Sequence, residues 1–293
     1  MIKLFGFENQ ISSLINNYVS QNLHSSIIIH GPKGIGKKIF IKKLLSEIFK
    51  SNLNENNYLH HVNLLNKDSH PNVRNIEKIF DTRKKKIKSE ITIDQIRNLR
   101  NFVNETASIK DLSKFIIIDS ADDLNINSAN SLLKILEEPN KDTFIFLISH
   151  QISSLIPTIR SRCLKIKLNK HEYNNFKNII SFHIDNITDD EIKFLYDITN
   201  GSPGDSILLY ENNIIEMFDL TIMSLSNLKT DQYSIELANM LTNMDNENFK
   251  SYLSFLKSIL VIMNKLKYEN FLKNNFLSNK FEKLKNISIK LTS

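Results

Sequence analysis

Cysteine is almost absent from this sequence. Its 293 residues include a single cysteine, Cys163, so no disulfide can form within the chain and a zinc site built on several thiolates is excluded. A chain without a disulfide framework is typical of a reducing compartment such as the cytoplasm. We expect Cys163 to be a small buried apolar residue and not a nucleophile.

Long apolar runs are also missing. Apolar runs such as residues 116–118 are far shorter than the roughly 20 residues that a helix needs to cross a bilayer. The first eight residues lack a basic start followed by an apolar core, so we expect no signal peptide. These absences predict a cytoplasmic protein with no membrane partner. The motifs HExxH and GxSxG are absent as well, which gives hydrolase and zinc-enzyme hypotheses little support.

The charge balance is mild. Lysine and arginine number 38 and aspartate and glutamate 32, for a formal charge of +6. This excess permits contact with nucleic acid but does not require it. Its most basic run, residues 83–88, lacks interleaved aromatic residues for base stacking, so we expect a solvated loop there. Hydrophobic residues make up 41% of the chain, enough for packed cores.

Strand-like and helix-like segments alternate in the first half of the chain. Continuous apolar strands separated by helices predict a parallel sheet with helices on both faces, an α/β fold. The expected strands are residues 27–29, 73–76, 115–119, 144–148 and 164–168. After residue 168 the strand signals fade, and from about residue 211 the pattern is entirely helical. Residues 51–69 are polar and asparagine-rich, with weak periodicity.

A glycine-rich segment follows the first expected strand and precedes a helical pattern. It reads Gly31-Pro32-Lys33-Gly34-Ile35-Gly36-Lys37, which fits the phosphate-binding pattern G-x-x-x-x-G-K. Gly31, Gly34 and Gly36 let the backbone curl so that its N–H groups face phosphate oxygens, and Lys37 would reach the β- and γ-phosphates.

The next position departs from this pattern. It should carry a serine or threonine hydroxyl that ligates Mg²⁺, but it is Lys38, whose ammonium has no acceptor lone pair. Two interpretations stay open at this point. The loop binds ATP or ADP at a degenerate site, or it is only a turn.

A second carboxylate site shows a matching defect. The strand at residues 115–119 ends in Asp119, which can still orient Mg²⁺ through its water shell. The following position, where AAA+ ATPases carry a glutamate base, is Ser120, and a hydroxyl has no useful basicity near neutral pH. Two interpretations of Asp122 and Asp123 stay open: one of them replaces the base, or these residues cap the next helix or lie in solvent.

Five segments together resemble the bacterial clamp-loader family of DNA polymerase III: residues 31–38, 93–97, 115–122, 130–139 and 156–163. The resemblance covers residues 1–210 well and the remainder only by length and helicity. It implies a AAA+ P-loop α/β domain at residues 1–167, a small helical lid domain at 168–210 and a helical oligomerisation (collar) domain at 211–293. Many relatives carry a four-cysteine zinc module after the loop helix. His60, His61 and His70 lie in that region here, without a recognisable ligand spacing, and we expect them at the surface.

Within the family the chain resembles the non-motor δ′ branch more than the τ/γ motor subunits. The defects at Lys38 and Ser120 agree with this, and the turn at residues 201–205 lacks the nucleotide-sensing arginine of the motors. The resemblance implies a stiff platform with little or no ATPase activity of its own, inside the DNA-directed DNA polymerase complex. Its partners would be the τ/γ and δ subunits, and through them the sliding β clamp and primed DNA.

Ser161-Arg162-Cys163 is similar to the family's Ser-Arg-Cys motif. There the arginine acts in trans on ATP bound by the neighbouring subunit, as a planar cation that stabilises charge on the γ-phosphate. The alternative is a surface arginine that begins a strand. Ser149 lies where the family places a nucleotide-sensing residue, or it simply ends its strand.

Two competing hypotheses remain at this stage. An active motor of the same family would hydrolyse ATP as a purified chain. An unrelated P-loop regulator or kinase would bind a small phosphate acceptor and no clamp-loader subunit.

Overall fold

The computed structural model describes most of the chain. Described are residues 2–81, 86–110, 112–140, 142–213, 217, 220, 221, 223, 224, 232–244, 249, 250, 252, 253, 255–257 and 261. The chain divides into two compact units, Met1–Asn169 and Lys170–Ser293. No helix among the described residues is long and apolar enough to cross a membrane.

The first unit is built on a sheet of five parallel strands. In spatial order they are β2 (Val73–Ile76), β5 (Lys114–Ile118), β6 (Thr143–Ser149), β1 (Ser26–His30) and β7 (Leu164–Lys167). Each corresponds to a strand expected from the sequence, and the parallel arrangement is confirmed. Neighbouring side chains of β1 alternate between the two faces, so Ile27 and Ile29 enter one hydrophobic cluster and Ile28 the other.

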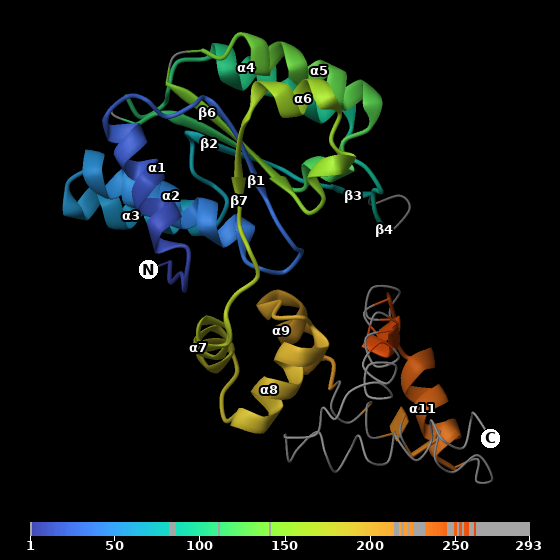
Figure 1. The fold of residues 1–293 in the computed structure, drawn as a ribbon. Coiled ribbons are helices and arrows are strands. Elements are labelled where there is room, and N and C mark those ends of the chain that lie inside the picture. The colour runs from blue at the N-terminus through green and yellow to red at the C-terminus, as the bar shows by residue number, and fades with distance from the viewer. Residues whose placement is uncertain are drawn as a thin grey trace. The chain divides into compact units, whose positions relative to one another are not determined.

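Helices cover both faces of this sheet (Figure 1). One face carries α1 (Glu8–Val19), α2 (Lys37–Asn52) and α3 (Glu55–Asn66), and the other α4 (Ile93–Asn104), α5 (Ile126–Glu137) and α6 (Pro157–Arg162). Burial on both faces explains why the strands are continuously apolar. Cys163 is buried in the second cluster, as expected, and burial raises its pKa to about 11.

The asparagine-rich segment contains a helix that weak periodicity did not reveal. In α3 the side chain of Asn54 accepts a hydrogen bond from the backbone N–H of Asn57 (3.0 Å), a typical N-cap. The side chains of Tyr58, Val62 and Leu65 form the face of α3 that packs against the core. Three buried apolar side chains in 12 residues are enough here because α2 supplies a surface against which they pack.

The expectation that His60, His61 and His70 lie at the surface is wrong for His70. Its side chain is only 1% exposed and stacks on Phe49, with ring centroids 4.7 Å apart. Its Nδ1 accepts a hydrogen bond from the backbone N–H of Asn72 (3.1 Å). Burial, with the neighbouring charges of His61 and His60, lowers the pKa of His70 to about 4.

A small antiparallel hairpin, β3 (Phe80–Asp81) and β4 (Lys86–Ile87), stands apart from the main sheet. Phe80 faces Ile87 across the pair, and both side chains are exposed. Residues 82–85 lie outside the described residues, so the solvated basic loop stays a prediction.

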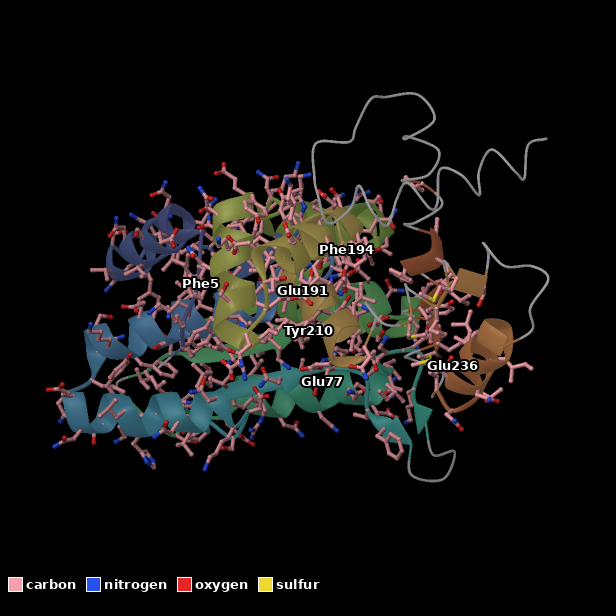
Figure 2. The ribbon with its side chains drawn as sticks, turned by 90° about the horizontal axis from the view of Figure 1, so that it is seen from below. Phe5, Glu77, Glu191, Phe194, Tyr210 and Glu236 are labelled. Atoms are coloured by element: carbon pink, nitrogen blue, oxygen red, sulfur yellow. The ribbon has the colours of Figure 1, made fainter. Side chains whose placement is uncertain are left out.

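The second unit is helical where it is described. Its helices are α7 (Tyr173–His183), α8 (Asp189–Ile198), α9 (Pro203–Glu211) and α11 (Gln232–Thr242). Thr188 and Glu191, the latter labelled in Figure 2, form a capping box that starts α8. Much of residues 211–293 lies outside the described residues, so the separate lid and collar domains stay predictions.

The buried His70 predicts a loss of stability in acid. An unfolded histidine takes up a proton near pH 6.5, whereas folded His70 does so only near pH 4. The free energy of unfolding should therefore fall as pH drops below about 6.5, with a His70 contribution of about 3 kcal/mol by pH 4. Urea titrations of wild type and His70→Phe at pH 7 and pH 4.5 measure this. The variant should lose less stability over that interval than wild type. Equal losses in wild type and His70→Phe would contradict the assignment.

Candidate functional site

The glycine-rich loop connects the carboxyl end of β1 to the first turn of α2. Gly34 and Gly36 have φ of 75° and 88°, in the left-handed region that favours glycine. A Cβ on Gly31 would lie 2.1 Å from the carbonyl oxygen of Leu168, so only glycine fits there. The α2 helix begins at Lys37 with no acidic residue in its first turn. The loop thus has the tight, glycine-dependent turn that the sequence predicts, while phosphate binding at this turn stays a prediction.

Lys37 is held by the loop itself. Its side chain is only 4% exposed, and Nζ donates to the carbonyl oxygens of Gly31 (2.7 Å) and Pro32 (2.6 Å). These bonds satisfy a buried ammonium without any phosphate.

Lys38 fills the position of the missing hydroxyl with an ion pair. Its Nζ lies 3.0 Å from Oε2 of Glu77, which directly follows β2 and is labelled in Figure 2. Burial acts to lower the pKa of Lys38, but the hydrogen bond and charge of Glu77, with Asp68 and Asp119, raise it above its ordinary value. Lys38 therefore stays charged. The residues present fit a phosphate but do not fit a Mg²⁺ ion held by a side-chain hydroxyl.

Asp119 lies at the carboxyl end of β5, on the same edge of the sheet as the loop. Its backbone N–H donates to the carbonyl oxygen of Ile76 (2.8 Å). Burial raises the pKa of Asp119, while the positive charges of Lys38, His150 and Lys37 act in the opposite direction. The structure therefore brings Asp119 within electrostatic reach of both loop lysines.

Asp122 is enclosed by hydrogen-bond donors. Oδ1 accepts from the hydroxyls of Ser149 (2.8 Å) and Ser154 (2.6 Å), and Oδ2 accepts from the hydroxyl of Ser120 (2.8 Å) and the backbone N–H of His150 (2.5 Å). Although burial acts to raise the pKa of Asp122, these donors lower it below its ordinary value.

This network assigns structural roles to residues that the sequence left open. A carboxylate with two donors on each oxygen is a poor proton acceptor, and it joins the ends of β5 and β6. Ser149 directs its hydroxyl to Asp122. Asp123 forms an ion pair with Lys78 (3.1 Å). In the sequence, the only signal for this hydrogen-bond network is the presence of serines next to strand ends.

Arg162 is the last residue of α6 and does not begin a strand, since β7 starts at Leu164. Its side chain is 36% exposed. Nη2 lies 2.6 Å from Oε1 of Glu137, the last residue of α5, and Nη1 donates to the carbonyl oxygen of Thr158 (3.0 Å). The guanidinium is therefore oriented and remains accessible to solvent.

The sheet register separates Arg162 from the loop. In the parallel pair β1–β7, Ile27 lies beside Leu164 and His30 beside Lys167. Arg162 precedes β7 and lies at the amino ends of the strands, whereas the loop follows β1 at the carboxyl ends. Four strand residues span about 13 Å. The predicted site residues thus form two groups, with the loop and Asp119 at one edge and Arg162 at the other.

A parallel sheet of this order, with a glycine-rich turn after β1 and helices on both faces, defines an α/β domain of the P-loop type. Residues 6–172 match the family described as "DNA polymerase III, delta subunit". This covers more than half of the chain, and the chain belongs to this family of clamp-loader subunits.

Individual relatives agree with this assignment. The chain is 34% identical over 149 residues to the DNA polymerase III subunit delta' of Pseudomonas aeruginosa, covering 50% of this chain and 43% of that protein. It is 26% identical over 216 residues to the DNA polymerase III subunit gamma of Buchnera aphidicola subsp. Schizaphis graminum, covering 72% and 57%. The matches span about half the length of these curated relatives.

A solved structure shares the fold. It is the crystal structure of a DNA polymerase III gamma subunit-related protein from Thermotoga maritima, with a TM-score of 0.50 and 16% sequence identity over 95% of this chain and 97% of that one.

The Asp122 network predicts a stabilising and not a catalytic role. Asp122→Asn replaces two acceptor sites by an NH₂ group and leaves buried donors unpaired, so the free energy of unfolding should fall by about 1–3 kcal/mol. Urea unfolding followed by circular dichroism measures this. The matched control is Asp123→Asn, which removes one partly exposed ion pair and should cost about 1 kcal/mol or less. Equal stability of wild type and Asp122→Asn would contradict the assigned role.

Proposed function

We propose that this chain is a non-motor, δ′-type subunit of a bacterial clamp loader in the cytoplasm. It joins τ/γ and δ subunits through a C-terminal collar at residues 211–293, with a lid domain at 168–210. The assembly opens the sliding β clamp and loads it onto primed DNA. Family membership and the similarity to subunits named delta' support this proposal.

The observation that carries the proposal is the place of Arg162. An arginine side chain at the amino ends of the strands cannot reach across the sheet to the chain's own phosphate loop. An accessible, oriented guanidinium there is suited to a phosphate bound by another molecule. Arg162 thus acts in trans, at the ATP site of the neighbouring τ/γ subunit, where it stabilises charge on the γ-phosphate.

The chain's own nucleotide site supports a platform role. Lys38 pairs with Glu77, Ser120 stands in the place of the base, and Asp122 is taken up by four hydrogen bonds. At the start of α9, where the motors carry a sensing arginine, Ser202 caps the helix by accepting from the backbone N–H of Asp205. Each of these arrangements replaces a hydrolytic function by an internal contact.

An active motor of the same family is the second candidate. The similarity to a gamma subunit over 72% of this chain favours it, and the arrangements at Lys38 and Asp122 count against it. The hypothesis of a P-loop regulator unrelated to replication loses its basis, because the chain belongs to a replication family.

Arg162→Ala should slow ATP hydrolysis by the assembly but leave its subunits associated. We expect the rate of ATP hydrolysis at the adjoining site to fall by a factor of about 10³ or more. The total rate of the reconstituted assembly should therefore fall by the fraction that this site contributes. Steady-state hydrolysis with clamp and primed DNA measures the rate, and size-exclusion chromatography checks assembly.

Two further variants define this result. Arg162→Lys keeps the charge but loses the planar fork, and should remain close to Arg162→Ala. Arg97→Ala removes another exposed arginine and should hydrolyse ATP at the wild-type rate. A normal rate with Arg162→Ala would overturn the trans role.

The purified chain should hydrolyse ATP no faster than a preparation carrying Lys37→Ala. Lys38→Thr restores a hydroxyl ligand, but it should not restore turnover, because no residue near Ser120 acts as the base. Release of inorganic phosphate measures both. Turnover by the wild-type chain that Lys37→Ala abolishes would establish the motor alternative.

A further inference from the structure

The contact between Arg162 and Glu137 joins two segments that are separated by 25 positions in the chain. Oε1 of Glu137 lies 2.6 Å from Nη2 of Arg162. We propose that Glu137 is a positioning residue that orients Arg162 for its contact with the neighbour's nucleotide. This inference rests on the proposed function and names a second residue of the same site.

The two helix ends that carry this pair are fixed by the core. Glu137 follows Leu136 at the end of α5, and Arg162 lies one turn after Ile159 in α6. Leu136 and Ile159 are both buried in the same hydrophobic cluster. Packing therefore sets the backbone positions of Glu137 and Arg162, and the attraction between their side chains has to determine only the side-chain torsions.

Two contacts define the plane of the guanidinium. Glu137 engages Nη2, and the carbonyl oxygen of Thr158 accepts from Nη1 (3.0 Å). A guanidinium has five N–H donors in one plane, so two contacts at its terminal nitrogens orient the whole group. A long side chain that is already oriented loses less rotamer entropy when it meets a phosphate. Glu137 thereby favours the productive orientation before the subunits meet.

The exposure of the pair indicates that Glu137 positions the guanidinium of Arg162 and does not hold it back from a nucleotide. The side chains of Arg162 and Glu137 are 36% and 47% exposed, and ion pairs this accessible to water are weak. Such a pair cannot withhold the guanidinium from a multiply charged triphosphate. It is sufficient to favour one side-chain orientation over others.

The test uses the full reconstituted assembly and the Arg162-dependent rate, which is the rate with wild-type chain minus the rate with Arg162→Ala. We expect Glu137→Ala to lower this rate about two- to fivefold, in the range of one exposed ion pair, with the KM for ATP unchanged because the neighbour binds the nucleotide. Glu137→Gln keeps an acceptor oxygen and should recover part of the loss. Glu138→Ala, a change at the adjacent exposed glutamate, should have no effect.

A double variant separates this inference from the proposed function. If Glu137 acts through Arg162, Glu137→Ala should cause no further loss when combined with Arg162→Ala. A further loss would reveal a merely structural role, and an unchanged or raised rate with Glu137→Ala alone would overturn positioning. If the assembly that carries Arg162→Ala hydrolyses ATP at the wild-type rate, the proposed trans role of Arg162 is wrong.

Discussion

The parallel pairing of β1 with its two neighbours is the constraint on which the site geometry depends. Parallel strands all point the same way, so every loop after a strand lies at one edge of the sheet and every segment before a strand lies at the other. The phosphate loop, Asp119 and the Asp122 network therefore gather at the carboxyl edge. Arg162 and Glu137 precede β7 and β6 and gather at the amino edge. One strand direction thus separates the predicted site residues into two groups at opposite edges of the sheet.

The carboxyl edge holds its charges in internal contacts. Lys37 donates to its own loop, Lys38 pairs with Glu77, and Asp122 accepts from four donors. Buried polar groups need such partners to avoid a large desolvation cost. A hydrolytic site instead keeps oriented groups available for a metal ion, a water molecule and the γ-phosphate. In the arrangement here, each of these charged groups is instead engaged by other groups of the same chain.

Much of this architecture could be predicted from the sequence because it depends on local patterns. Short apolar or alternating segments identified all five strands, and the glycine spacing identified the loop. Side-chain partners were not predictable, because they come from distant positions. Lys38 meets Glu77 across 39 residues, and Asp122 meets Ser154 across 32. Burial of His70 likewise depends on Phe49 in another element. Only the folded chain determines which polar residues find one another.

The glycine motif has a structural reason that is independent of nucleotide. The carbonyl oxygen of His30 accepts from the N–H of Leu168 (2.8 Å), and the N–H of Gly31 donates to the carbonyl oxygen of Ser149 (3.3 Å). The start of the loop is thereby fastened to the ends of β6 and β7, and a side chain on Gly31 would collide with Leu168. Because β7 begins two residues after Arg162, this junction helps to hold in register the strand that follows the helix carrying Arg162. These contacts give the glycine loop a structural requirement that holds whether or not it binds a nucleotide, because the loop helps to align β7 with the rest of the sheet.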